Sequence, residues 1–133
     1  MINPINLSDR MKNLTPIAGR GEHTTEEEVR QAFTKLGDGD FRDAGVYLGS
    51  FDGIAGWERH LKGDEMVHIV AGSTHFDIII DDDKHTLELD AGMLIVVPQG
   101  CWHRFRSDDG VTVLATTPQN DEEHMFVDDP RSL

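Results

Sequence analysis

The sequence has few basic residues and a single cysteine. Its 12 Lys and Arg stand against 25 Asp and Glu, which gives a formal net charge of −13. A chain this acidic repels phosphate backbones and anionic headgroups, so we expect no nucleic-acid partner and no membrane partner. Cys101 has no second cysteine to pair with, which excludes an internal disulfide.

Long hydrophobic segments are also missing. The longest unbroken apolar run is Met93 to Val97, far shorter than the roughly 20 residues that span a bilayer. The opening stretch, MINPINLSDRMKN, lacks a basic region followed by an apolar core, so no secretory signal is expected. Together these absences predict a cytoplasmic protein.

The chain of 133 residues has the length of one domain. No internal repeat or low-complexity linker divides it, so we expect a single domain over residues 1–133. Composition separates three parts within that domain. They are an N-terminal arm and helix, a β-rich core and an acidic tail, with expected bounds 1–40, 41–117 and 118–133.

The N-terminal part is expected to hold one short helix. Residues 1–23 show no sustained period, and we expect them to form an extended arm. From residue 24 the stretch TTEEEVRQAFTKLGDG has acids in its first turn and Gly37 as a stop. Thr25 and Glu28 have the spacing of a capping box, which predicts an amphipathic helix.

Beyond Phe41, short apolar stretches alternate with turn residues about every ten residues, which is typical of an all-β barrel or sandwich. Turns are expected at DG, KGD, AGS, DDDK, DAG, PQG and DDG. The predicted strands are 44–51, 56–61, 66–71, 75–80, 86–89, 94–97, 103–106 and 111–116.

Two carboxylates and two histidines interrupt these strands. Side chains alternate across a strand, so Glu58 and His60 point to one face. The KGD turn then brings Glu65 beside the strand that carries His60. With Glu65 inward, Val67 and Ile69 are expected to point inward too, while Met66 faces out. In the later stretch PQGCWHRF, His103 shares a face with Phe105. If both faces line one barrel interior, the two acids and two imidazoles converge.

Buried carboxylates without partners are costly, so such a cluster needs protons, basic partners or a cation. We expect no Lys or Arg on the inward face. A divalent metal would turn all four groups into ligands and tie three strands together. A metal-free polar network of the same groups is the alternative. The predicted metal ligands are Glu58, His60, Glu65 and His103.

The spacing of these residues resembles the two motifs of the cupin superfamily. His60, Glu65 and Gly72 match the later part of the first motif. The second motif is matched by Gly92, Pro98, Gly100 and His103. The resemblance covers about residues 44–117. It implies a double-stranded β-helix, a small jelly-roll barrel whose mouth holds one metal.

The match to the cupin motifs has departures. Glu58 stands where the first motif has a histidine, and Ser107 stands where the second has an asparagine. Gly53 is one position out of register with the opening glycine of the first motif. The form WERHxxGDE, with a closing DDPR, resembles a subgroup of small cupins.

The ligand set suggests a class of chemistry. Two carboxylates cancel the 2+ charge of a metal, which disfavours hydrolysis by a metal-bound hydroxide. Open positions beside two histidines suit Fe, Mn or Ni better than Zn. We therefore expect a metal-dependent oxygenase, lyase or isomerase acting on a small organic molecule, with Phe105, Phe76 and Val67 as apolar walls. The alternatives are a non-catalytic module that binds a small ligand or senses a metal, and a metal-free structural cupin.

The remaining polar residues are expected to have ordinary roles. Cys101 is expected to be a buried, inert thiol, and Arg104 and Arg106 to pair with surface acids. The barrel cannot hold all of its apolar residues, so an outer apolar face and a homodimer are expected. Five histidines are expected to lie outside the site, namely His23, His68, His75, His85 and His124.

Overall fold

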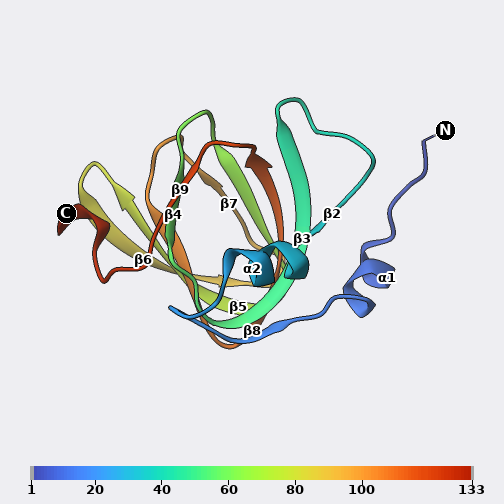
Figure 1. Ribbon diagram of the computed structural model, residues 1–133, viewed down its shortest axis with the longest axis horizontal. Coiled ribbons are helices and arrows are strands. Elements are labelled where there is room, and N and C mark those ends of the chain that lie inside the picture. The colour runs from blue at the N-terminus through green and yellow to red at the C-terminus, as the bar shows by residue number, and fades with distance from the viewer. Residues whose placement is uncertain (1, 133) are drawn as a thin grey trace.

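The computed structural model describes residues 2–132, and strands dominate it. They form one sheet that curls into a jelly-roll barrel (Figure 1), so the all-β prediction is confirmed. None of the helices within residues 2–132 is long and apolar enough to cross a membrane. In chain order the elements are α1 (Leu7–Lys12), β1 (Ile17–Arg20), α2 (Glu26–Ala32), β2 (Thr34–Lys35), β3 (Ala44–Ile54), β4 (Trp57–His60), β5 (Glu65–Ile80), β6 (Asp83–Asp90), β7 (Leu94–Val97), β8 (His103–Pro118), β9 (Glu122–Met125) and η1 (Pro130–Ser132).

The long strand β8 organises the barrel. It pairs antiparallel with β3 on one side and with β5 on the other. The start of β8 also pairs with β4, and β4 in turn pairs with β9. Strands β6 and β7 both pair with β5. Antiparallel pairing puts the first residues of β5 and β8 at opposite ends of their ladder, so it is the curl of the sheet that brings both of them close to β4.

Three of the predicted turns are bends within continuous strands. The DG stretch at Asp52–Gly53 and the AGS and DDG stretches were expected to break the chain, but β3, β5 and β8 run through them. Gly72 and Gly110 both have positive φ, and a Cβ on Gly72 would lie 2.2 Å from the carbonyl oxygen of Gly110. The two glycines therefore let the strands bend and touch without ending the ladder.

The core lies between the curled strands. Val67 and Ile69, predicted to point inward from β5, are fully buried, while their neighbour Met66 is exposed. Burial of such a side chain contributes about 1.5–3 kcal/mol. The buried hydrophobic core consists of Phe51, Val67, Ile69, Phe76, Ile78, Leu89, Val97, Val111, Val113 and Ala115.

The predicted helix is present but shorter than expected. Thr25 and Glu28 form the predicted capping box at the start of α2. The helix ends at Ala32 rather than at Gly37, because Thr34 and Lys35 pair with β3 as β2. Pairing with an existing strand outweighs the weak helical preference of those residues.

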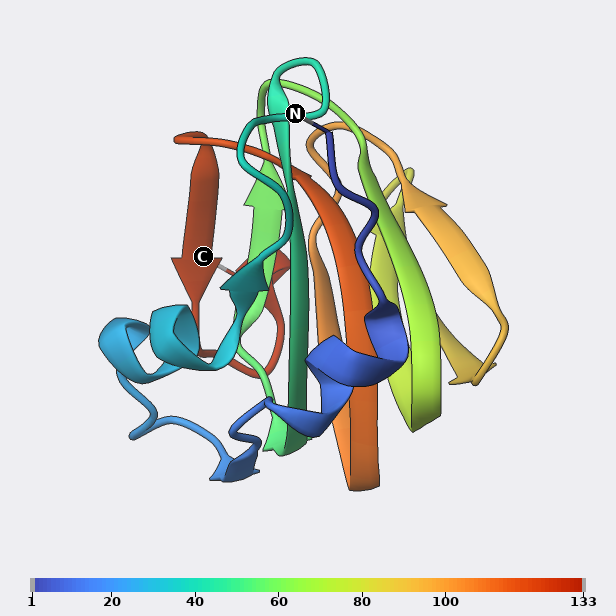
Figure 2. The ribbon, with the colours of Figure 1, turned by 90° about the vertical axis from the view of Figure 1, so that its right-hand side faces the viewer.

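The N-terminal arm is more structured than the sequence predicts. Asn6 accepts a hydrogen bond from the Asp9 N–H and so caps a second helix, α1. Ile17 to Arg20 form β1, which runs parallel to β3. In Figure 2, β1 and both helices lie along the lower half of the barrel. The expectation of a single N-terminal helix is therefore wrong.

The acidic tail also contributes a strand. No strand was predicted beyond residue 116, yet β9 pairs with β4 from Trp57↔Met125 to His60↔Glu122. The residues of β9 are largely exposed, so they lack the apolar alternation by which a strand is recognised. Pairing with β4 therefore holds β9 as a strand, although the sequence of β9 does not predict one.

Candidate metal centre

The structure brings the four predicted ligands to one point. Two of them lie on β4, one opens β5 and one opens β8. One potential ligand atom from each lies within 4.8 Å of the others. Their role as metal ligands stays a prediction. We call this group the Glu–His cluster, and it consists of Glu58, His60, Glu65 and His103.

Strand register explains the convergence. Glu58 pairs directly with His103 across the β4–β8 ladder. The Nε2 atom of His103 lies 3.0 Å from Glu65 Oε1 and 3.4 Å from Glu58 Oε1. The Nε2 atom of His60 lies 3.4 Å from the nearest oxygen of each carboxylate.

Hydrogen bonds behind the cluster fix the two imidazoles. The Nδ1–H of His103 donates to the carbonyl oxygen of Cys101 at 3.0 Å. The Nδ1 atom of His60 lies 3.1 Å from Asp121 Oδ1, and a carboxylate can only accept there. With the proton held on Nδ1, each Nε2 presents a lone pair to the cluster.

Three buried atoms of the cluster have no hydrogen-bond partner among the described residues. They are His60 Nε2, His103 Nε2 and Glu65 Oε1. With both imidazoles neutral, all three are acceptors, because each Nε2 faces carboxylate oxygens and Glu65 Oε1 faces the Nε2 of His103. Such a group is stable only if protons or a cation enter it.

The pKa values of the two imidazoles also indicate that protons or a cation must enter the cluster. Burial opposes the charged form of His60, but a protonated Nε2 can donate to Glu58 and Glu65, and this outweighs burial and raises the pKa of His60 to about 11. The same competition raises the pKa of His103 to about 10. Without a metal, the imidazoles therefore hold protons between the carboxylates. A divalent cation could take the place of those protons, so the donor set fits a metal.

A cavity of about 770 Å³ opens beside the cluster. All four cluster residues line it, together with apolar side chains that include Phe105. The other two predicted walls are not at its surface. Phe76 is fully buried behind the cluster, where its ring stacks on His103 at 5.6 Å, and Val67 is fully buried in the core.

Comparisons with known proteins agree with this geometry. Residues 57–117 match the ARD/ARD' family. The chain resembles a cupin-2 domain protein from Shewanella frigidimarina with a TM-score of 0.62 and 18% identity, over 86% of this chain and 94% of that one. It is 30% identical to the uncharacterized protein YdbB of Bacillus subtilis, over 74% of this chain and 77% of that protein. The chain therefore has the fold of the cupin-2 domain protein, and it belongs to the same family as YdbB.

Part of this cupin is also similar to acireductone dioxygenases. The protein from Rhodopseudomonas palustris strain TIE-1 is 44% identical over 50 residues. The matched segment covers 38% of this chain and 30% of that dioxygenase, so only about a third of that relative is represented. No comparison tests membership of the WERHxxGDE subgroup, which stays a prediction.

Three residues beside the cluster of this cupin were missed by sequence reasoning. Asp121 orients His60, and Thr117 donates a hydrogen bond of 2.7 Å to Glu65 Oε2. His124, which was expected to lie outside any site, lies on β9 with its Nδ1 atom 3.6 Å from Glu58 Oε2. The missed strand β9 carries His124 and follows directly after Asp121, so no local signal could have placed them.

Two expectations about arginines are wrong. Arg20 lines the cavity, although no basic residue was expected on the inward side. Arg104 and Arg106 pair with an acid that is fully buried, Asp77, rather than with surface acids. Burial disfavours the charged form of Asp77, but both guanidinium groups outweigh burial and hold the pKa of that carboxyl well below its usual range.

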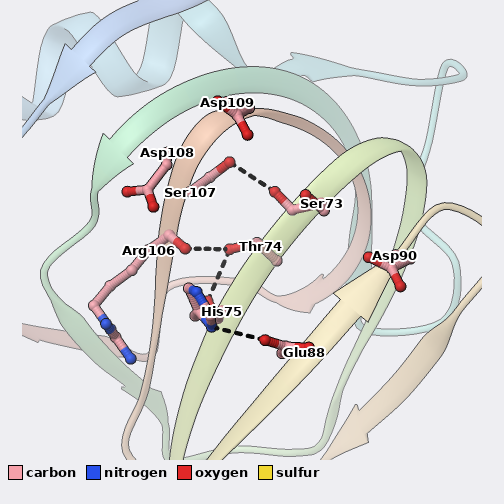
Figure 3. Close-up of a pocket in the computed structure, with 9 residues that line it drawn as sticks. All are labelled: Ser73, Thr74, His75, Glu88, Asp90, Arg106, Ser107, Asp108 and Asp109. Carbon is pink, nitrogen blue, oxygen red and sulfur yellow. Dashed lines mark hydrogen bonds and ion pairs between the residues drawn. The ribbon is translucent and has the colours of Figure 1, made fainter.

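A second cavity, of about 210 Å³, lies where β5 and β8 bend. Figure 3 shows hydrogen bonds and an ion pair among several of its lining residues, while Asp90, Asp108 and Asp109 make none with the residues drawn. Ser107 donates to the Ser73 carbonyl at 2.7 Å, and the Thr74 hydroxyl lies within hydrogen-bond distance of the His75 and Arg106 carbonyls. Among the described residues, those that line this cavity include no buried polar atom without a hydrogen-bond partner, unlike the Glu–His cluster.

Proposed function

We propose that the Glu–His cluster holds one divalent transition metal, and that this cupin uses the metal as an oxygenase acting on a small organic molecule. The observation that carries the proposal is the set of three buried, unpartnered atoms directed at one point. Two imidazoles and two carboxylates with an adjoining cavity suit Fe(II), Mn(II) or Ni(II), and Zn(II) is the further possibility.

Similarity to oxygenases supports the reaction class. The segment that matches the ARD/ARD' family, residues 57–117, contains the whole cluster. A hydroquinone 1,2-dioxygenase, PnpCD, whose structure contains Cd²⁺ and 4-hydroxybenzonitrile, shares the fold with a TM-score of 0.60 and 15% identity. That match covers 86% of this chain and 72% of that one. A bound Fe(II) would supply one-electron chemistry with dioxygen.

The surrounding residues have separate roles in this proposal. The Cys101 carbonyl and Asp121 hold the ligand nitrogens in position, and Thr117 holds one oxygen of Glu65. His124 lies at the exposed side of Glu58, where it can exchange a proton with a bound substrate. Phe105 forms part of an apolar wall that excludes water from the cavity.

Metal analysis followed by oxygen uptake tests the proposal. Protein purified without chelators should hold close to one equivalent of a transition metal, and His103→Ala should lose it. Less than about 0.2 equivalents after careful loading would refute the proposal. The Fe(II)-loaded protein should then consume dioxygen with some member of a panel of diketones, catechols and thiols, and His103→Ala should not.

The two carboxylates favour a second candidate function. Glu58 replaces a histidine of the cupin motif, and the added negative charge weakens the metal as a Lewis acid. A module that binds a small ligand or senses a metal would tolerate this loss. In that case metal and ligand bind without dioxygen uptake or product. A lyase or isomerase would form product without consuming dioxygen.

The proposal also includes a homodimer in the cytoplasm. Met66 pairs with Val96 across the β5–β7 ladder, and Leu94 lies two residues from Val96 on the same face. These three side chains are between 37% and 53% exposed. An apolar face of this kind favours contact with a second copy of the chain.

A further inference from the structure

Arg20 is a basic residue of the main cavity whose guanidinium has no hydrogen-bond or ion-pair partner among the described residues. Two other arginines line the same cavity, but Arg30 pairs with acids of its own helix and Arg104 pairs with Asp77. The Arg20 guanidinium makes no hydrogen bond and no ion pair within 4.0 Å among residues 2–132. Its five N–H donors are therefore free for a ligand.

Aromatic rings hold the Arg20 side chain in place. Its guanidinium carbon lies 4.7 Å from the ring centre of Phe51 and 5.9 Å from that of Phe33. Stacking of this kind fixes a planar guanidinium and leaves its edges available for hydrogen bonds. A ligand that binds there would not have to order a mobile side chain.

The backbone of Arg20 is fixed as well. Arg20 is the last residue of β1 and pairs with Gly53 of β3, which has a φ of +99°. A Cβ on residue 53 would lie 2.2 Å from the Arg20 carbonyl oxygen. Only glycine at this position lets β1 lie so close to β3, and β1 carries Arg20 to the cavity.

Arg20 lines the same cavity as the Glu–His cluster. Burial lowers the pKa of Arg20, and the Glu58 carboxylate opposes this effect, which indicates that the two charges sense each other. Glu58 directs Oε1 toward both cluster imidazoles, at 3.4 Å from each Nε2, and so has partners of its own. Arg20 and the cluster residues line one cavity, and within residues 2–132 no ion pair of 4.0 Å or less joins the guanidinium to a cluster carboxylate.

We propose that Arg20 is the anion-binding residue of this cavity and that the substrate is a small organic carboxylate with an apolar body. The inference rests on the proposed function, because it names the substrate class of the same site. A guanidinium binds a carboxylate through two parallel hydrogen bonds. Since the chain carries a net charge of −13, an anion needs such a dedicated cation to enter. The apolar body would lie against Phe33, Phe105 and Phe126, which line the cavity.

Benzoate and its neutral analogue benzamide test the inference by isothermal titration calorimetry on the metal-loaded protein. We expect wild type to bind benzoate more tightly than benzamide. Arg20→Gln should weaken benzoate binding about tenfold or more, which corresponds to one lost charge-assisted pair, and leave benzamide unchanged. Arg30→Gln is the matched control, since it removes a cavity arginine that already has partners, and it should bind both probes as wild type does.

Further measurements separate binding from folding. Arg20→Lys keeps the charge but loses the planar fork, so it should retain part of the preference for benzoate even if Arg20→Gln does not fold. The inference is overturned if wild type shows no preference for benzoate, or if the Arg20 variants bind benzoate as tightly as wild type does. The same titrations on metal-free protein test Arg20 even if the proposed metal is absent, so the two failures are distinguishable.

Discussion

Single residues behind the cluster determine which imidazole nitrogen of each histidine faces the centre of the cluster. The backbone carbonyl of Cys101 and the carboxylate of Asp121 each face an imidazole Nδ1, so each Nε2 is directed inward. Asp121 is tied in turn to the Lys62 backbone N–H at 2.8 Å, which holds the carboxylate still. Cys101 itself is a partly buried free thiol, and burial raises its pKa. Its backbone matters more here than its sulfur.

Replacing Asp121 should weaken the proposed metal site without removing a ligand. Asp121→Ala leaves the Nδ1 atom of His60 without its acceptor, and we expect metal affinity to fall about 10- to 100-fold. Competition with a chromophoric chelator measures this change. Glu123→Ala is the control, because Glu123 is an exposed acid on β9 whose partner is Arg59. Equal affinities of Asp121→Ala and wild type would show that Asp121 does not orient the ligand.

The negative charge of Asp77 is stabilised by the residues that donate hydrogen bonds to it. It accepts hydrogen bonds from Arg104, Arg106 and Thr86, and it is fully buried. Removing one partner of a buried ion pair leaves the other charges uncompensated. We expect Asp77→Asn to lower the free energy of unfolding at pH 7 by about 3 kcal/mol, measured by urea denaturation.

The effect of Asp77→Asn should depend on pH. The folded-state pKa of Asp77 is depressed, so its contribution is complete above the unfolded-state pKa of about 3.9 and is lost as pH falls below it. The stability difference between wild type and Asp77→Asn should therefore shrink between about pH 5 and pH 2. Asp90→Asn, at an exposed acid, should show a small and constant difference. Parallel profiles for wild type and Asp77→Asn would contradict this account.

At the scale of elements, the contact between β1 and β3 is the least expected feature. The sequence of β1, IAGR, has neither strong strand propensity nor alternation. The strand forms because Gly53 admits its backbone, while the Gly19 N–H donates to Asp52 Oδ1. A side chain on residue 53 would separate the two strands.

Gly53→Ala should detach β1. We expect a loss of about 2–4 kcal/mol, because the new methyl combines a strained positive φ with a clash against backbone. Gly92→Ala is a matched control, since Gly92 has a φ of +91° and nothing within 4 Å of the added Cβ. That variant should lose only about 1 kcal/mol. Urea denaturation gives both values, and faster proteolysis of the N-terminal segment should occur in Gly53→Ala alone. Equal losses in the two variants would exclude the close-contact explanation.

At the scale of the whole molecule, the proposed metal would join three strands. The cluster takes its residues from β4, β5 and β8, so a metal binds the folded chain and not the unfolded one. At a concentration of about 100 times Kd, Mn(II) or Ni(II) should add about 2.7 kcal/mol and raise Tm by about 10 °C. His103→Gln should remove this shift in differential scanning calorimetry. A shift of equal size in that variant would place the metal elsewhere.

The outer apolar face predicts how the molecules associate. A chain of 14.9 kDa should elute as a dimer when its mass is measured by light scattering. Val96→Lys places a charge at the centre of that face and should give a monomer. Leu87→Lys, on β6, changes a residue that is also exposed but lies outside the face, and it should remain dimeric. A wild-type monomer would end the dimer proposal.

The sequence predicted the residues of the cluster, and it predicted the barrel through the resemblance of its spacing to the cupin motifs. Strand alternation placed Val67 and Ile69 inward, and the capping box of Thr25 and Glu28 marked the start of a helix. The same alternation put Glu58 and His60 on one face. These features are encoded by neighbouring residues, whose preferences are visible without the rest of the chain.

Only the tertiary structure decided the surroundings of the site. Arg20 and His124 reach the cavity from β1 and β9, and Asp121 reaches His60 just ahead of β9. Both strands form through pairing with strands that are distant in the sequence, β3 and β4. Backbone pairing of this kind depends on which groups are left open at a sheet edge rather than on local side-chain preference. The residues that orient a ligand or bind an anion could therefore be identified only once the chain was folded.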